Sequence, residues 1–112
     1  MADRFYLKQY DLKPDLSVRL LDDTAAVDLT NATAAKLRMS NRRVGLKVDA
    51  AMTIADQSLP ATLGVVTYSW AAGDTDIAGD FDAEIQVVWP SGKPQTFPAH
   101  GHIGITIEKD LG

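Results

Sequence analysis

Residues 80–89 read Asp80-Phe81-Asp82-Ala83-Glu84-Ile85-Gln86-Val87-Val88-Trp89. Apolar side chains occupy every second position from Phe81 to Trp89, and polar side chains fill most of the positions between them. A strand with one buried face has this two-residue period, whereas a helix would spread the same residues around its circumference. The stretch therefore predicts a β-strand, and it predicts that Trp89 lies in the core.

The same alternation recurs along the chain and gives about seven strands in all. The further candidates are residues 4–9, 16–20, 32–39, 44–55, 62–70 and 102–108. The alanines of residues 32–39 would also suit a helix, but the alternation favours a strand. Residues 44–55 are long enough for one bent strand or two short ones.

Turn-forming residues separate these segments, as in sandwiches and barrels. Residues 90–93 predict a hairpin turn that leads from residues 83–89 to a strand near residues 95–97. In residues 62–70, Val66, Tyr68 and Trp70 share one face, so Trp70 is a second candidate for the core. We expect an all-β fold, an immunoglobulin-like antiparallel β-sandwich of about seven strands, in which one connection between strands could form a short helix.

Length and composition predict one folded domain over residues 1–112. The chain has 112 residues, of which 46% are hydrophobic and 23% charged, and it has no cysteine. Disulfides and thiolate chemistry are thereby excluded. The formal net charge is -4 and the only basic pair is Arg42-Arg43, so we expect no nucleic-acid partner. No apolar run approaches the roughly 18 residues of a membrane span, and residues 1–4 lack the apolar region of a secretory signal, so we expect synthesis in a cytoplasm.

Two clusters raise the question of a metal. Asp74, Asp76, Asp80, Asp82 and Glu84 form an acidic stretch that could hold calcium, although its spacing is not that of an EF-hand. Side chains on a solvated strand face, with Asp74 and Asp76 bonding nearby backbone amides, are the favoured alternative. His100 and His102 would share a strand face, but two ligands are too few for a metal site, so exposed or interface histidines are favoured.

Catalytic motifs are also lacking in the sequence, which contains no nucleophile elbow, phosphate loop or zincin helix. Asp80 and Asp82 could serve acid-base chemistry on a glycan, but any solvent-facing strand can carry acids at alternate positions. We therefore expect a protein that is not an enzyme and that uses no cofactor and no metal.

The order of short motifs resembles a known family. These motifs are Phe5-Tyr6-Leu7-Lys8-Gln9-Tyr10-Asp11, Pro14 before Leu16, Leu20-Leu21-Asp22, Val27-Asp28-Leu29-Thr30, Val66-Thr67-Tyr68-Ser69-Trp70, Gly73-Asp74-Thr75-Asp76, Gly79-Asp80-Phe81-Asp82-Ala83-Glu84 and Phe97-Pro98. Together they resemble the N-terminal domain family of phage upper baseplate proteins (BppU-type), over nearly the whole chain. The resemblance implies an immunoglobulin-like domain that makes contacts within a tail or baseplate assembly.

On this basis we expect a bacteriophage virion structural protein, located in the virion, that acts through contacts with tail, baseplate or capsid proteins and forms homo-oligomers in the particle. A capsid decoration protein of the same fold and a module that binds a glycan or host surface are the alternatives. Residues 1–10 would serve as a docking arm, since Phe5, Tyr6, Leu7 and Tyr10 are too apolar to be left together in water.

Overall fold

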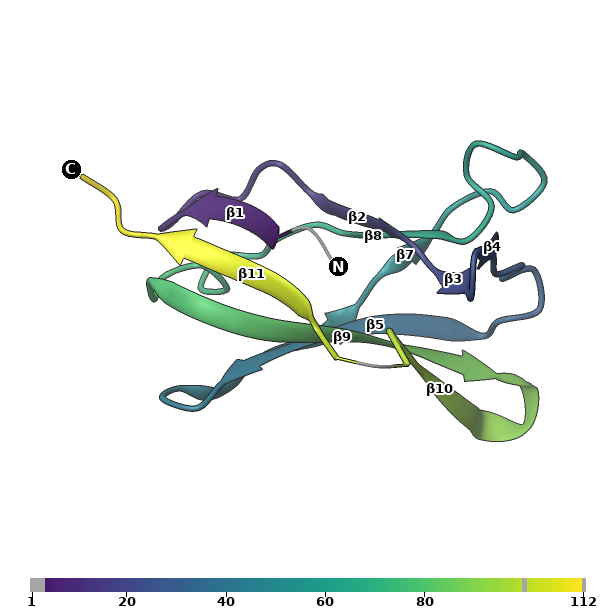
Figure 1. Ribbon diagram of the computed structural model, residues 1–112. Coiled ribbons are helices and arrows are strands. Elements are labelled where there is room, and N and C mark those ends of the chain that lie inside the picture. Colours follow the sequence, from purple (N-terminus) through teal and green to yellow (C-terminus); the bar gives the residue numbers. More distant parts are fainter. Residues whose placement is uncertain (1–3, 100, 112) are drawn as a thin grey trace.

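The computed structural model describes residues 4–99 and 101–111, which form two packed β-sheets (Figure 1). The strands are β1 (Arg4–Lys8), β2 (Leu16–Arg19), β3 (Leu21–Asp22), β4 (Ala25–Ala26), β5 (Ala34–Asn41), β6 (Gly45–Ala51), β7 (Thr53–Ile54), β8 (Val65–Tyr68), β9 (Gly79–Trp89), β10 (Lys93–Phe97) and β11 (Ile103–Glu108). The all-β prediction is confirmed.

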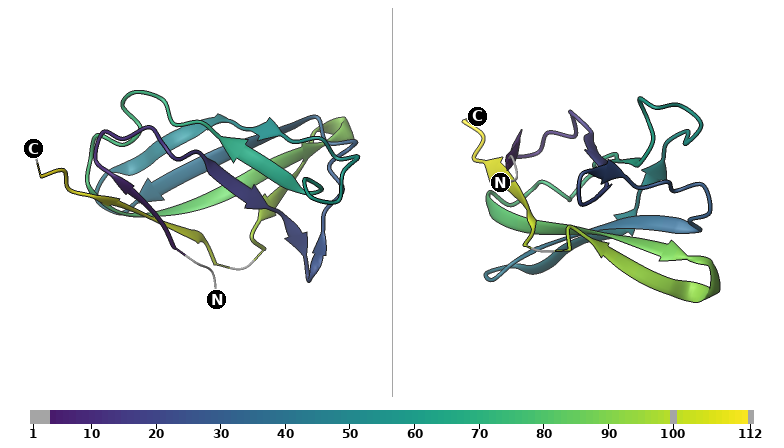
Figure 2. Two further views of the ribbon diagram at one scale, coloured as in Figure 1. Left: turned by 90° about the horizontal axis from the view of Figure 1, so that it is seen from above. Right: turned by 45° about the vertical axis from the view of Figure 1, so that its right-hand side comes forward.

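The larger sheet is built around β9, the longest strand. Its strand order is β1-β11-β9-β5-β6. β10 and β11 share one edge of β9: β11 pairs with the first half of β9, and β10 pairs with its second half. The order of the second sheet is β2-β8-β7, and a small hairpin joins β3 to β4. Figure 2 shows the two sheets as separate layers. This order matches the C–F–G and B–E–D sheets of immunoglobulin-like sandwiches.

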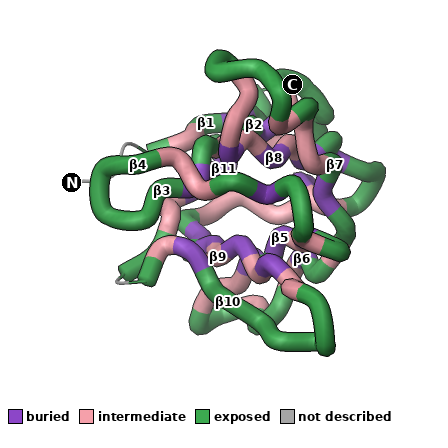
Figure 3. Tube along the Cα trace, turned by 90° about the vertical axis from the view of Figure 1, so that its right-hand side faces the viewer, coloured by how far each residue is buried: buried purple, intermediate pink, exposed green. Residues whose placement is uncertain are grey.

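The core lies between the sheets and follows the alternation of the sequence. Phe81, Ala83, Ile85 and Val87 of β9 are each at most 1% exposed. From the opposite sheet Val66 and Tyr68 face them, and β11 adds Ile105 and Ile107. Buried segments alternate with exposed ones along the trace in Figure 3. Removal of this apolar surface from water is the main force that holds the sheets together.

Residues 44–55 form two strands that belong to different sheets. β6 pairs with β5 in the larger sheet, and β7 pairs with β8 in the second sheet. Met52 lies between them, is buried, and donates its backbone amide to the carbonyl of Ala35 at 2.9 Å. The segment thus crosses from one sheet to the other at Met52, as the two-strand alternative predicts.

Three expectations require correction. The described residues form eleven strands, and three of them (β3, β4 and β7) have only two residues each, too few to produce a periodic signal. The sandwich is not wholly antiparallel, because β1 runs parallel to β11. Instead of a short helix, the described residues contain one 3-10 turn, Pro90–Gly92, which forms the expected link between β9 and β10.

The prediction that both tryptophans lie in the core is confirmed for Trp70, which is 5% exposed. It is confirmed only in part for Trp89, which is partly buried and packs against the edge of the core. Trp89 is the last residue of β9, where the β9-β10 hairpin diverges from the second sheet (Figure 1). Its indole Nε1 instead donates to Oε1 of Gln95 at 2.9 Å on the neighbouring strand.

Candidate interface

The four apolar residues of the expected docking arm lie on and just after β1. Within β1 the side chains alternate, so Leu7 is buried and Phe5 is partly buried, with its ring stacked on that of Trp70 at a centroid distance of 6.2 Å. Tyr6 is 58% exposed and Tyr10 is 63% exposed. In this conformation only the two tyrosines could meet a partner, and residues 4–8 are an edge strand of the sheet.

Tyr10 has an unusual backbone conformation. Its φ is 73°, in the left-handed region that bulky residues rarely adopt. Its amide donates to the carbonyl of Thr75 at 3.0 Å, and the amide of Asp11 donates to the carbonyl of Lys8 at 3.1 Å. Thr75 is 1% exposed, and its hydroxyl donates to the carbonyl of Asp11 at 3.0 Å. The turn is therefore fixed to the loop that precedes β9.

Gln9 fixes the same turn from the other side. Its amide donates to the carbonyl of Glu108 at 2.7 Å, and its Nε2 donates to the carbonyl of Asp76 at 2.8 Å. Its Oε1 accepts from the amide of Asp110 at 3.3 Å. The exposed ring of Tyr10 is thus presented on a backbone tied to both β11 and the loop before β9, which lowers the entropy lost when a partner binds.

Tyr6 lies on an open strand edge. Among the described residues, β1 pairs only with β11. Because the amide of Gln9 binds Glu108, the backbone groups of Phe5 and Leu7 point toward β11 and those of Tyr6 point to the open edge. An unpaired edge of this kind can accept a strand from another chain.

Exposed ion pairs flank Tyr6 on the outer face. Lys8 Nζ lies 3.2 Å from Glu108 Oε1, and Arg4 Nη1 lies 3.8 Å from Asp80 Oδ1. The Arg4 side chain extends across Gly104, where an added Cβ would lie 2.8 Å from the guanidinium. Exposed pairs such as these contribute about 0–1 kcal/mol each, so they orient side chains more than they stabilise the fold.

The acidic stretch does not converge on one point. Asp74 Oδ2 accepts from the Tyr68 hydroxyl at 2.5 Å and from the amide of Ala71 at 2.8 Å, which confirms the expected bond to a nearby backbone amide. Asp76 instead pairs with Lys47 on β6 at 2.5 Å, and the Lys47 side chain is only 14% exposed. These two acids brace the loop before β9.

The remaining acids lie on the outer face of the larger sheet. Asp80 Oδ1 accepts from the hydroxyl of Thr106 at 2.8 Å, Asp82 is exposed, and Glu84 Oε2 lies 3.9 Å from Nε2 of His102. His100 lies outside the described residues. Over residues 4–99 and 101–111, no group of three or more His, Asp or Glu side chains is placed to hold a metal ion.

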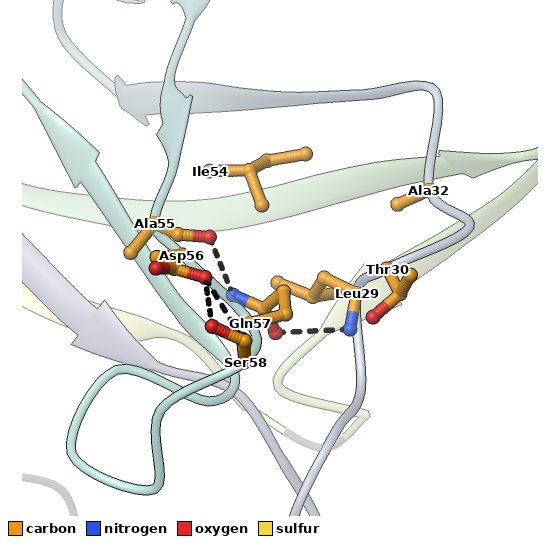
Figure 4. Close-up of a pocket in the computed structure, with 8 residues that line it drawn as sticks. All are labelled: Leu29, Thr30, Ala32, Ile54, Ala55, Asp56, Gln57 and Ser58. Atoms are coloured by element: carbon orange, nitrogen blue, oxygen red, sulfur yellow. Dashed lines mark hydrogen bonds between the residues drawn. The ribbon is translucent and has the colours of Figure 1, made fainter.

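A pocket of about 420 Å³ opens at the other end of the sandwich, and sequence reasoning did not find it. Its lining is shown in Figure 4 and consists of Leu29, Thr30, Ala32, Ile54, Ala55, Asp56, Gln57 and Ser58. Gln57 Oε1 accepts from the amides of Leu29 at 3.0 Å and Gly64 at 2.8 Å. Its Nε2 donates to the carbonyls of Ala55 at 2.8 Å and Thr62 at 3.2 Å. Gln57 therefore clamps two loops together.

The sequence does contain one signal of this region, a repeated Asp-x-Ser/Thr pattern. Asp28 Oδ1 accepts from the hydroxyl of Thr30 at 2.5 Å and from its amide at 2.9 Å, and these bonds lower the pKa of Asp28. Asp56 receives the same two bonds from Ser58, which lower its pKa in the same way. Such local bonds shape turns, so the pattern predicts loop geometry and not a ligand.

No protein-family model and no curated protein sequence matches this chain. In the described part of the chain no helix is long and apolar enough to cross a membrane.

Proposed function

We propose that this protein is a structural component of a bacteriophage virion, in the tail or baseplate, that acts through protein-protein contacts and not by catalysis. Its partners are other virion proteins and further copies of itself. The resemblance to BppU-type N-terminal domains motivates the proposal, and the immunoglobulin-like sandwich is the fold which that resemblance implies.

The observation that carries the proposal is the presentation of Tyr6 and Tyr10. Both rings are more than half exposed, at 58% and 63%, beside a strand edge that has no partner among the described residues. Tyrosine rings give a large contact area at low entropic cost and are enriched among residues that dominate binding energy. A domain that assembles by docking needs such rigid, exposed aromatic anchors.

The location can be tested in purified phage particles. We expect mass spectrometry to find the chain in the particles, and immunogold labelling to mark the tail end. Labelling of the capsid would replace the tail assignment with the capsid decoration alternative. Particles that lack the chain would overturn the virion proposal.

The anchors can be tested by substitution. We expect Tyr6→Ala together with Tyr10→Ala to reduce incorporation into particles at least about tenfold, since hot-spot residues contribute about 2 kcal/mol or more. Leu59→Ala is the matched control, because Leu59 is 51% exposed on the loop between β7 and β8, at the other end of the sandwich (Figure 1). Substitution is preferable to deletion of residues 1–8, which would also remove the buried Leu7. Normal incorporation of the double variant would show that the tyrosines are not anchors.

One observation favours a second candidate, a module that binds a glycan or host surface. Trp89 is partly exposed beside Gln95, and an aromatic ring next to a polar side chain suits sugar recognition. Titration of host cell-wall polysaccharide against Trp89→Ala and the parent protein separates the two functions. Saturable binding that Trp89→Ala abolishes would favour this candidate.

A further inference from the structure

The outer face of the larger sheet, turned away from the second sheet (Figure 2), has an ordered charge pattern on its central strands. β5 presents Lys36, Arg38 and Ser40, and β9 presents Asp82, Glu84 and Gln86. The two strands pair in register, with Arg38 opposite Glu84 and Ser40 opposite Asp82. A basic row thus runs beside an acidic row along the β5-β9 seam, meaning the line between these two strands.

Arg38 stands out within the basic row. Lys36 pairs with Asp49 at 3.3 Å, and Glu84 lies 3.9 Å from His102. Arg38 is exposed, and among the described residues its side chain makes no hydrogen bond or ion pair. A guanidinium offers five donors in a fixed fork that suits a carboxylate, so Arg38 is available to an acid outside its own chain.

The face also has a shallow hollow at each end of the seam. A hollow of about 210 Å³ is lined in part by Arg38, Leu46 and Glu84, and Leu46 is 55% exposed. A second hollow of about 340 Å³ is lined in part by Ala34, Ala51 and Val88. The face therefore combines small apolar side chains at one end with paired charges and an exposed leucine at the other.

We propose that a second copy of this chain binds this face about a two-fold axis that runs parallel to the strands along the β5-β9 seam. Such an axis places β5 of each copy over β9 of the other. It leaves the position of each residue along the strand direction unchanged. Because Arg38 and Glu84 lie at the same level, Arg38 of each copy faces Glu84 of the other, and two reciprocal ion pairs form.

The same operation brings further complementary groups together. Ala34 and Val88 are partners across the seam. Ala34 of each copy therefore faces Val88 of the other copy, and the apolar ends of the two faces meet. Leu46 on β6 lies over β11 of the second copy at the level of Gly104, where the Arg4 side chain crosses the strand. The contact thus has an apolar end and a charged end, each self-complementary.

Charge complementarity also explains why this face and not the β1 edge receives the second copy. Antiparallel pairing of two β1 strands about Tyr6 would place Arg4 opposite Lys8 of the other copy. Like charges directly opposite one another on paired strands are destabilising. The β1 edge therefore suits a different partner, whereas the β5-β9 seam suits a copy of the chain.

The inference deepens the proposed assembly function and rests on it for its biological role. Its test needs only the purified chain. We expect the parent protein to associate from monomer to dimer between about 1 µM and 1 mM in sedimentation equilibrium, the range of a weak specific contact. Arg38→Glu and Glu84→Arg should each weaken the dimer at least about tenfold, because each creates two like-charge contacts.

Mixing these two variants gives the decisive result. In the mixed dimer the carboxylate introduced by Arg38→Glu faces the guanidinium introduced by Glu84→Arg, and the second contact is the original pair of Arg38 with Glu84. Equimolar mixing should therefore restore dimerisation to near the parent level, although each variant alone dimerises at least about tenfold more weakly than the parent. Arg43→Glu, a charge reversal of equal size in the β5-β6 turn, should leave association unchanged. Thermal melts of each variant separate loss of folding from loss of association.

A parent chain that stays monomeric over this range, or a mixture that stays monomeric, would overturn the two-fold contact. Dimers that survive both reversals would do so as well, and would point to another surface. None of these outcomes bears on incorporation into particles through Tyr6 and Tyr10, so failure of this inference is distinguishable from failure of the proposed function.

Discussion

The hydroxyl of Tyr68 donates a hydrogen bond of 2.5 Å to Oδ2 of Asp74, across the loop that leads from β8 to β9. Tyr68 is 4% exposed, and its ring packs edge-on against that of Trp70 at a centroid distance of 5.1 Å. A buried hydroxyl is thus satisfied by a carboxylate that also accepts the amide of Ala71. The bond ties the second sheet to the loop that carries Thr75 and, through it, Tyr10.

This bond predicts a pH dependence of stability at high pH. Burial first, and then the hydrogen bond and negative charge of Asp74, raise the pKa of Tyr68. In the unfolded chain tyrosine titrates near pH 10, so the stabilisation is complete below about pH 10 and is lost as pH rises above it. Melting temperature from pH 8 to 11 should therefore fall more steeply for the parent than for Tyr68→Phe. Tyr6→Phe is the control, since Tyr6 is exposed. Equal slopes for the parent and Tyr68→Phe would contradict the prediction.

The four hydrogen bonds of Gln57 predict an asymmetric response to substitution. In Gln57→Glu the carboxylate keeps both backbone amides but faces the carbonyls of Ala55 and Thr62 without a donor. We expect a loss of about 1–3 kcal/mol at pH 7 in urea unfolding. The difference from the parent should shrink as pH falls below about 4, where the glutamic acid regains a proton to donate. Ser58→Ala serves as the loop control, and a pH-independent difference would argue against the clamp.

The two tryptophans predict unequal effects on stability. Trp70 is buried, and its Nε1 donates to the carbonyl of Pro14 at 3.1 Å, so Trp70→Ala should cost about 3–5 kcal/mol. Trp89→Ala should cost about 1 kcal/mol, since part of its ring stays in water. In single-tryptophan proteins, Trp70 emission should be blue-shifted relative to that of Trp89. Similar melting points for the two alanine variants would be incompatible with this placement.

We also expect folding without metal. Asp74 and Asp76 already bind Tyr68, Ala71 and Lys47, so a cation would have to displace these contacts. Addition of EDTA or of calcium at about 1 mM should leave the melting temperature within about one degree, since only a ligand that binds the folded chain raises its stability. Magnesium is the matched control for ionic strength. A rise of several degrees with calcium alone would revive the acidic stretch as a site.

The local alternation of apolar and polar residues was sufficient to predict a strand and its buried residues where the strand has several residues and one buried face. The apolar residues Phe81, Ala83, Ile85 and Val87 lie in the core as their alternation predicts. A shift of the strand by one residue would turn all of them to solvent, so the buried face fixes the register. Trp89 continues that alternation and yet is partly exposed, because burial also requires cover from the opposite sheet, from which the β9-β10 hairpin diverges at this end. The burial of Leu7 inside an expected docking arm has the same origin: the sequence shows an apolar strand but not its neighbour.

The sequence by itself determined the fold class, most of the strands and the residues of the core, because these depend on a two-residue period within one segment. Tertiary structure alone decided which segments meet. Only the paired sheets bring Tyr10 onto Thr75, Gln57 onto Leu29, and Arg38 beside Glu84. These contacts join residues that are far apart in the chain. Whether such residues meet depends on the whole fold, because the intervening loop must close, and this leaves no periodic pattern in the sequence.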